Sequence, residues 1–392
     1  MLKIMKSKMK PVKSTNVDNL VKKKLDYFQD VIQRTALYVQ HNKLLNIIGI
    51  GDCNSCINTI SSLNKHINNP ELQGDNAINI LQLINNELST IFKSFGTKSL
   101  EDLLYICFGN NDDSMYASPE DMAKFELLKK YFHPTGYKVS TKLDASLACE
   151  EHSANVKSFY TKVHGMQLTI IHPSNKRGLI ITGTVDDIVL DLLNNSYINN
   201  IRIQIQENKP KEASFSSKLF DSYIGSFSLK DYLVTPYDVI YSKFVGYVSQ
   251  LNSLNQKPIH GIIKEFVGQP LFFKRNTIIM LLINTTKNDH QYLAYLLYDL
   301  MSNDAAGAID TLDQMSLFDS LPHSIKECFR IAMKKTVQYT TDLSDFDTSK
   351  IPIEQQICLM NAPDTVKEKA MQKLKEVKSK SEDSCSKAKQ YL

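Results

Sequence analysis

The chain has 392 residues, of which 42% are hydrophobic and 22% are charged, and its formal net charge is +4. This length exceeds one ordinary hydrophobic core, so we expect two or three domains. The composition excludes wholesale disorder, and the small net charge does not by itself indicate nucleic-acid binding. Seven irregularly spaced cysteines favour a reducing compartment.

No segment of the sequence predicts membrane insertion or secretion. The N-terminus lacks an apolar signal segment, and the longest purely apolar run, Ile278–Ile283, is far shorter than the roughly 20 residues that span a bilayer. We therefore expect a cytoplasmic protein that does not associate with membranes. Trp is absent while Lys, Asn and Ile are frequent, a bias typical of AT-rich genomes such as those of large DNA viruses and some protists. For a viral protein the compartment would be the host cytoplasm.

The first 135 residues are predicted to form a basic flexible arm (1–15) and an N-terminal helical domain (16–135). Apolar residues repeat at helical spacing from Val21 to Val39, and a helix that Asp75 caps ends at Gly96. Two further helices begin with capping pairs. These pairs are Ser99 with Asp102 and Ser118 with Asp121, and the second helix has the inner face Met122, Phe125, Leu128 and Phe132.

The hydrophobic period changes in the next segment, which predicts a small α+β module at 136–210. Residues 167–172 and 179–182 resemble the two strands of a β-hairpin around a turn-rich loop. A helix is expected from Val185 to Asn195. The strict alternation of residues 201–206 predicts a half-buried strand.

A second helical domain is predicted at 211–350. Ser228 can cap a helix that Pro236 interrupts, and Pro258 and Pro270 mark further breaks. Residues 272–284 are apolar nearly all round, as in a buried helix, and Ser320–Pro322 opens another helix before a polar loop at 342–350. Tyrosines 292, 295 and 298 share one helix face, which fits a core or domain interface, or alternatively a groove for a partner. The fold class is thus mainly α, with multi-helix bundle regions and a small α+β insert at about 136–208.

The last segment, 351–392, is predicted to be a helical arm or linker. Pro363 suits the first helical position, Asp364 and Glu368 favour its N-terminal end, and lysines crowd the C-terminal end at Lys378. Apolar residues form a narrow stripe along this helix. A polar break follows at 379–386, and a second helix begins at 387.

This tail resembles the helical linker upstream of the ATPase domain in Lon-family ATP-dependent proteases. The resemblance covers about residues 361–392 and rests on Lys367-Glu-Lys-Ala370, Leu374, Val377, the serines at 381, 384 and 386, and Tyr391-Leu392. The chain lacks a proline in the turn and ends before the Asp-Trp of the family signature. The resemblance implies a non-catalytic region that engages substrates or organises the oligomer of a Lon-like AAA+ ATPase, or a relic of one. The ATPase and serine protease domains would then lie outside this chain.

Few residues suggest chemistry, and we expect no cofactor and no catalytic residue. The phosphate-binding string G-x-x-x-x-G-K-[ST] does not occur. Cys53 and Cys56 have a zinc or redox spacing, and Cys149 with His152 is the nearest second pair, so these four are weak metal candidates. Small buried cysteines are the commoner interpretation of such a pair. Asp345-Phe-Asp347 matches a phosphatase motif but lacks the preceding strand, which favours an exposed loop.

The interaction candidates are basic residues. Lys176 and Arg177 lie on the predicted hairpin loop, and Lys367, Lys369, Lys373 and Lys375 lie on the terminal helix. An alternative hypothesis is therefore a helical structural or interaction protein whose lysine-rich ends bind an acidic partner or nucleic acid. Under either hypothesis we expect a protein partner or self-association.

Overall fold

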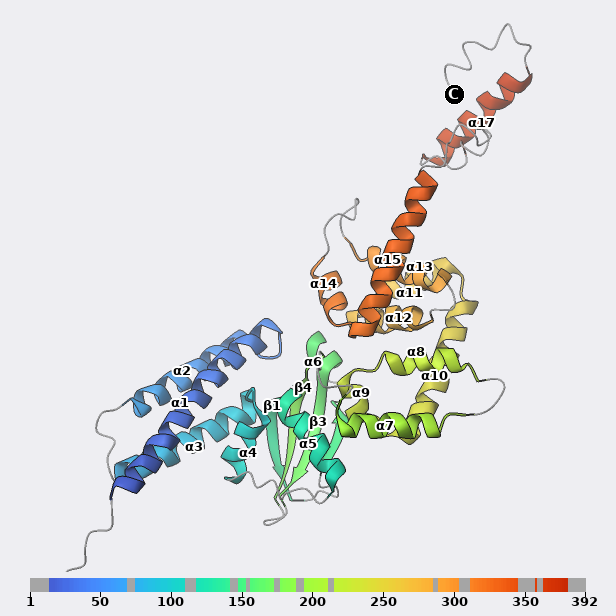
Figure 1. The fold of residues 1–392 in the computed structure, drawn as a ribbon. Helices are drawn as coiled ribbons and strands as arrows, with labels where there is room; N and C mark the ends of the chain where they lie inside the picture. The colour runs from blue at the N-terminus through green and yellow to red at the C-terminus, as the bar shows by residue number, and fades with distance from the viewer. Residues whose placement is uncertain are drawn as a thin grey trace, which may run out of the picture. The chain divides into compact units, whose positions relative to one another are not determined.

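The computed structural model describes residues 14–68, 75–109, 118–141, 147–152, 156–172, 177–187, 194–210, 215–284, 288–302, 311–344, 357 and 362–379. These residues are mainly helical with one small antiparallel sheet, which confirms the predicted fold class (Figure 1). Most of the predicted basic arm and the second helical start at 387 lie outside the described residues. The chain divides into two compact units, Met1–Arg330 and Ile331–Leu392.

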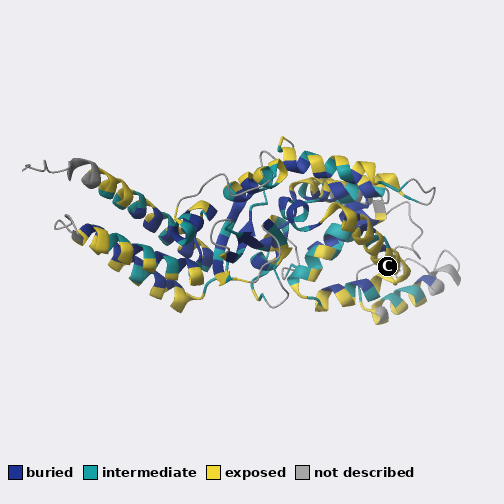
Figure 2. Ribbon diagram, turned by 90° about the horizontal axis from the view of Figure 1, so that it is seen from below, coloured by how far each residue is buried: buried dark blue, intermediate teal, exposed yellow. Residues whose placement is uncertain are grey.

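Three helices begin the first unit: α1 (Ser14–Leu44), α2 (Ile50–Ile67) and α3 (Asp75–Phe95). The long helix predicted from the apolar repeat is α1, which packs on both α2 and α3. Buried and exposed residues alternate along these helices, as amphipathic helices require (Figure 2). Gly49 is the N-cap of α2, between α1 and α2, and Gly51 lies within α2.

Capping serines start the next two helices, as predicted. The Ser99 hydroxyl accepts from the Asp102 amide at the start of α4 (Leu100–Phe108), and the Ser118 hydroxyl accepts from the Asp121 amide at the start of α5 (Pro119–Tyr131). The predicted inner face of α5 is correct at Phe125 and Leu128 only. Met122 is 46% exposed, and Phe132 is buried from a strand rather than from the helix.

The sheet contains β1 (Phe132–Ser140), β2 (Leu147–Glu151), β3 (Gly165–Ile171) and β4 (Gly178–Val185). Its order is β1-β4-β3-β2, and all three pairings are antiparallel. Strands β3 and β4 form the predicted hairpin. The short helix α6 (Phe159–His164) connects β2 to β3.

The strand predicted at 201–206 is wrong, because these residues belong to helix α7 (Ser196–Glu207). The Asn195 side chain accepts from the amides of Tyr197 and Ile198 and so starts a helix. Within α7, Ile198, Ile201 and Ile205 are buried at helical spacing. The helix expected from Val185 to Asn195 is also wrong at both ends. Val185 is the last residue of β4, and residues 186–187 and 194–195 are not helical. Residues 188–193 lie outside the described part.

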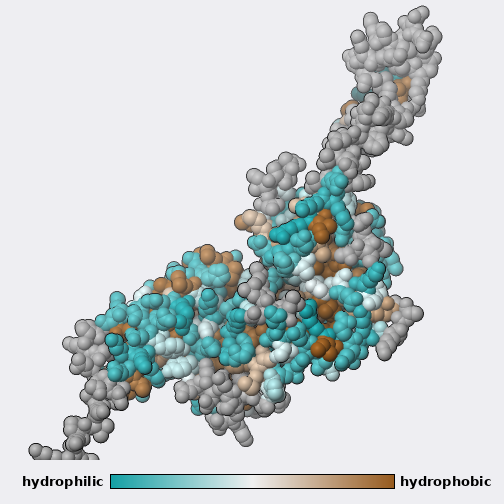
Figure 3. All heavy atoms as spheres, viewed as in Figure 1, coloured by the Kyte–Doolittle hydropathy of each residue, from teal (hydrophilic) through white to brown (hydrophobic). Residues whose placement is uncertain are grey.

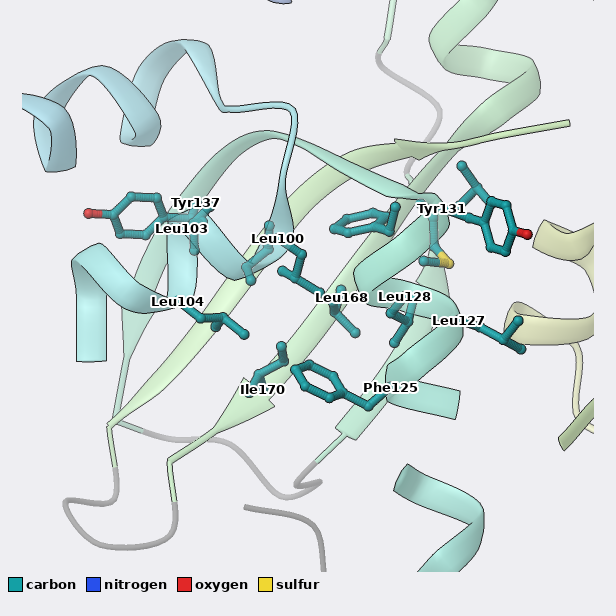
Figure 4. Close-up of a cluster of buried hydrophobic side chains, with 14 of the residues drawn as sticks. Leu100, Leu103, Leu104, Phe125, Leu127, Leu128, Tyr131, Tyr137, Leu168 and Ile170 are labelled. Carbon is teal, nitrogen blue, oxygen red and sulfur yellow. The ribbon is translucent and has the colours of Figure 1, made fainter. Parts of the chain in front are cut away.

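Helices cover the sheet and share its core. Helices α3, α4 and α5 contact β1, α6 contacts β3 and β4, and α9 (Leu229–Val234) contacts β2. Figure 4 shows Leu128 and Phe125 of α5 beside Leu168 and Ile170 of β3. The same cluster of buried side chains extends from Phe28 in α1 to Phe244 in α10 (Tyr237–Gln256).

The first unit continues with further helices, and the predicted proline breaks precede three of them. They are α8 (Ser217–Gly225), α9 (Leu229–Val234), α10 (Tyr237–Gln256), α11 (Ile259–Gly268), α12 (Leu271–Ile283), α13 (Asn288–Asp299) and α14 (Leu312–Asp319). Pro236, Pro258 and Pro270 are the N-cap residues of α10, α11 and α12. Ser228 forms the expected cap of α9, as a capping box with Asp231.

Three details of this region refine the predictions. The exposure of the tyrosines on α13 differs along the helix, since Tyr298 is buried and Tyr292 is 46% exposed. Helix α12 is buried at Ile278, Leu281 and Leu282, but Phe273 is 54% exposed, so the helix is not buried all round. Helix α15 (His323–Ser344) includes the start of the loop predicted at 342–350, and residues 345–350 lie outside the described part.

The second unit contains the predicted terminal helix, α17 (Asp364–Ser379). The carbonyl of Pro363 accepts from the amides of Val366 and Lys367, as expected for the residue that opens a helix. In the described part of the chain, every helix is too short or too polar to cross a bilayer. The surface in Figure 3 is mostly hydrophilic, with apolar side chains in small separate patches.

Candidate functional site

The four weak metal candidates lie in two different surroundings. Cys53 and Cys56 point into the core from α2, where burial raises the pKa of the Cys56 thiol to about 12. Cys149 lies on β2 opposite Leu168, burial raises its pKa as well, and His152 follows the end of β2. The described residues contain no group of three or more His, Cys, Asp or Glu side chains that could hold a metal ion.

The predicted basic contact residues lie on two segments that are far apart in the sequence. Arg177 is exposed directly before β4, and its carbonyl accepts from the His172 amide at 2.9 Å, while Lys176 is outside the described residues. On α17, Lys369 and Lys373 are exposed and Lys367 is partly exposed; Lys375 lies in the same helix. These two sets of residues therefore belong to different units of the chain.

A cluster of three cations, which sequence patterns did not reveal, lies in the first unit. Lys230 of α9 donates to the Val163 carbonyl at 3.1 Å, and Lys326 of α15 donates to the Asp319 carbonyl at 2.7 Å. Arg275 of α12 donates to the Ser320 carbonyl from Nε at 3.1 Å and from Nη2 at 2.7 Å. These carbonyls lie at the C-terminal ends of α6 and α14, where the helix dipole favours positive charge.

Main-chain oxygens, rather than carboxylates, satisfy these cations. Within the described residues, Lys230, Arg275 and Lys326 form no ion pair, although Asp187 and Asp231 are close enough to influence the pKa of Arg275. Burial lowers the pKa of Arg275 to about 10, so its guanidinium remains charged at neutral pH. Carbonyl dipoles compensate a full charge only in part, so this region favours an anion.

His164 lies beside the same cations and is neutral. Burial, together with the charges of Arg275 and Lys230, lowers its pKa to about 3. Its ring packs against Tyr160 with centroids 4.6 Å apart. The imidazole therefore adds no positive charge to the cluster at neutral pH.

Arg275 also lines a hollow of about 550 Å³ that α8, α9, α10 and α12 surround. Its aromatic wall consists of Tyr223, Phe227, Tyr247 and Phe273, and its polar lining includes Gln250, Gln269, Asn276 and Asp231. The Tyr247 hydroxyl fixes one side by donating to the Met280 carbonyl at 3.0 Å. Aromatic surface with a few fixed polar groups is typical of a ligand site.

A second hollow of about 210 Å³ adjoins the first and is lined by residues of α10, α11 and α12. The linings of the two share Gln250, Gln269, Thr277 and Met280, and the two adjacent hollows together are here called the α10–α12 groove. The Oε1 atom of Gln269 is buried and has no hydrogen-bond partner within the described residues. A buried amide oxygen without a partner costs about 1–3 kcal/mol, so it favours a donor.

The α10–α12 groove has one indirect signal in the sequence. Lys274 and Arg275 interrupt the apolar run at 272–284, and a charged residue in such a run suggests a buried polar role. The groove itself combines positions from 223 to 322, which only the tertiary structure brings together. Chemically, this arrangement can hold an anion by charge-assisted hydrogen bonds beside an apolar group.

No protein-family model, no curated protein and no solved structure matches the chain.

Proposed function

We propose that this chain is a non-catalytic, protein-engaging region of a Lon-like AAA+ ATPase, or a relic of one. The observation that carries the proposal is the α10–α12 groove, which combines aromatic surface, amide side chains and a charged Arg275. Such a surface suits an unfolded polypeptide, which presents both apolar side chains and unpaired main-chain groups. The helix α17, where the chain resembles the Lon linker, supports the assignment to that class.

The proposal is tested by binding of an unfolded protein to the purified chain. We expect fluorescently labelled casein to bind with a measurable change in anisotropy, and a folded control protein of similar size not to bind. Phe273→Ser should weaken casein binding, because Phe273 is 54% exposed and lines the groove. Val139→Ser is the matched control, since Val139 is 60% exposed and lies on β1 away from the groove lining.

Two results would contradict the proposal. Casein that does not bind at any accessible concentration would remove the protein-engaging role. Robust ATP hydrolysis by the purified chain would remove the non-catalytic assignment.

A second candidate function is binding of an acidic partner or nucleic acid through lysine-rich segments. It is favoured by the exposure of Lys22, Lys23 and Lys24 on α1 and of Lys369 and Lys373 on α17. Binding to duplex DNA or RNA should then weaken as the salt concentration rises. Replacing Lys22–Lys24 by Gln should reduce the slope of log K against log salt concentration by about one for each lost contact between a lysine and a phosphate. An affinity independent of salt would eliminate the nucleic-acid version.

A further inference from the structure

We propose that the α10–α12 groove binds the C-terminal end of a polypeptide, with the terminal carboxylate on Arg275 and a large apolar last side chain on the aromatic wall. This inference rests on the proposed protein-engaging function and names the feature that the site selects. It follows from the unused donors of Arg275, the lining residues that the two hollows share and the chemistry of their walls.

Arg275 is held in place and still has donors to offer. Its hydrogen bonds within the described residues go to Ser320, from Nε and Nη2, which leaves the hydrogens of Nη1 uncommitted. Because Ser320 fixes the guanidinium plane, a carboxylate meets a preorganised cation. The Ser320 contacts thus position Arg275 for a ligand at its other edge.

The length and lining of the groove fit a main chain rather than a small ion. The two hollows share four lining residues, and their linings together include Arg275 in the larger hollow and Lys257 and Glu265 in the smaller one. Gln250 and Gln269 line both hollows, and the Oε1 atom of Gln269 has no partner within the described residues. A main-chain N–H satisfies that oxygen when the amide turns toward the groove, and an anion without an N–H or O–H group cannot.

The aromatic wall selects the last side chain. Tyr223, Phe227 and Tyr247 form part of a packed aromatic cluster, with Tyr223 and Phe227 ring centroids 5.2 Å apart and those of Tyr223 and Tyr247 5.3 Å apart. Phe273, which is 54% exposed, supplies apolar surface on the side of α12. A large apolar residue that covers these rings removes that surface from water.

Asp231 favours a carboxylate over a phosphate. It is an acidic residue in the lining of the larger hollow, and its Oδ2 accepts from the Ser228 amide at 2.8 Å and the Ser228 hydroxyl at 2.7 Å. Its negative charge opposes a dianion more strongly than a monoanion. Phosphate is therefore expected to compete poorly.

The test compares two peptides on the unmodified protein. A labelled hexapeptide that ends in phenylalanine carries either a free carboxylate or a C-terminal amide, and fluorescence anisotropy measures both affinities. We expect the amide to bind about tenfold or more weakly, because it loses a charge-assisted hydrogen bond. Equal affinities would overturn the inference.

Variants localise the effect. Arg275→Gln should abolish the difference between acid and amide, while Lys274→Gln should preserve it, because Lys274 is the adjacent cation on α12 and does not line either hollow. An acid preference that survives in a folded Arg275→Gln protein would place the carboxylate elsewhere. The wild-type comparison of the two peptides remains decisive if Arg275→Gln does not fold.

Competitors distinguish the source of the carboxylate. N-acetylphenylalanine carries the same acid with only the last amide of the main chain, and inorganic phosphate carries no apolar group, so both should displace the peptide only weakly. Displacement by either at a concentration similar to that of the peptide would overturn the polypeptide assignment. If labelled casein binds while acid and amide peptides bind equally, this inference fails and the proposed function stands; if casein also fails to bind, the proposed function itself fails.

Discussion

Gly96 directly follows α3 and lies against strand β1 of the sheet. It ends α3 with φ of 73°, and the amide of the next residue, Thr97, donates to the Pro134 carbonyl at 3.0 Å. A Cβ atom at Gly96 would lie 2.0 Å from the Pro134 oxygen. This position therefore requires glycine both for its backbone conformation and for the close approach of β1.

Gly96→Ala should lower the free energy of unfolding by about 2 kcal/mol or more, measured by urea denaturation, because it adds both backbone strain and a clash. The control is Gly246→Ala within α10, where an added Cβ meets nothing within 4 Å. That change should raise stability by about 0.5–1 kcal/mol, because alanine is the better helix former. Equal effects of the two substitutions would contradict this account.

His133 connects the start of β1 to the end of β4. Its Nδ1 lies 2.7 Å from the Lys98 carbonyl, and its Nε2 lies 2.9 Å from Oδ1 of Asp186. Both partners only accept, so the bonds favour the doubly protonated ring. Burial by itself would lower the pKa of His133, but the bonds to Asp186 and Lys98 outweigh it and raise the pKa.

The raised pKa predicts the sign of a pH effect. The stabilisation from His133 is fully present below the unfolded-state pKa of about 6.5 and is lost as pH rises through the higher folded-state pKa. His164, whose pKa is lowered, acts in the opposite direction, so its contribution is lost as pH falls below about 6.5. The measurement is therefore the difference in unfolding free energy between wild type and Asp186→Asn across this range. That difference should shrink as pH rises, and a difference independent of pH would refute the His133–Asp186 contribution.

At the scale of elements, α10 is anchored by aromatic packing. Phe244 is 3% exposed, and its ring contacts those of Phe220 and Tyr223 with centroids 5.0 and 5.4 Å apart. Phe244→Ala should cost about 3–5 kcal/mol of stability in thermal or urea unfolding, because it leaves a cavity among these rings. The adjacent Val245 is 49% exposed, and Val245→Ala should change stability by less than about 0.5 kcal/mol. A small loss at Phe244 would mean that the ring cluster does not anchor α10.

The isoleucine pattern of α7 fits both a strand and a helix. Ile201, Ile203 and Ile205 alternate as in a strand, but Ile198, Ile201 and Ile205 also fit one helix face. The cap at Asn195 and contacts of α7 with α5 and α10 select the helical period, which leaves Ile203 56% exposed. Six residues are too few for periodicity alone to decide between the two.

At the scale of the whole molecule, the hydrophobic core of the first unit contains residues from both sides of the predicted domain limits at 135 and 210. The limits themselves stay predictions. Buried residues from α1 to α10, including Leu88 of α3 and Phe244, belong to one cluster. A shared core predicts cooperative unfolding. Leu88→Ala and Phe244→Ala should therefore shift the same transition, seen at the same urea concentration by far-UV circular dichroism and by tyrosine fluorescence. Two separate transitions, each sensitive to only one substitution, would contradict the shared core.

Local chemistry in the sequence determined much of the helical framework. Ser99, Ser118 and Ser228 begin helices, prolines at 236, 258 and 270 separate others, and the Pro363 start predicts α17, because each signal acts within a few residues. The hairpin of β3 and β4 followed in the same way from adjacent segments. Only the tertiary structure decided that Phe132 begins an edge strand, that 201–206 is helical, and that Arg275 meets Ser320 beside rings from α8 and α10. Those outcomes depend on which distant surfaces become buried together, and the local order of residues does not encode that by itself.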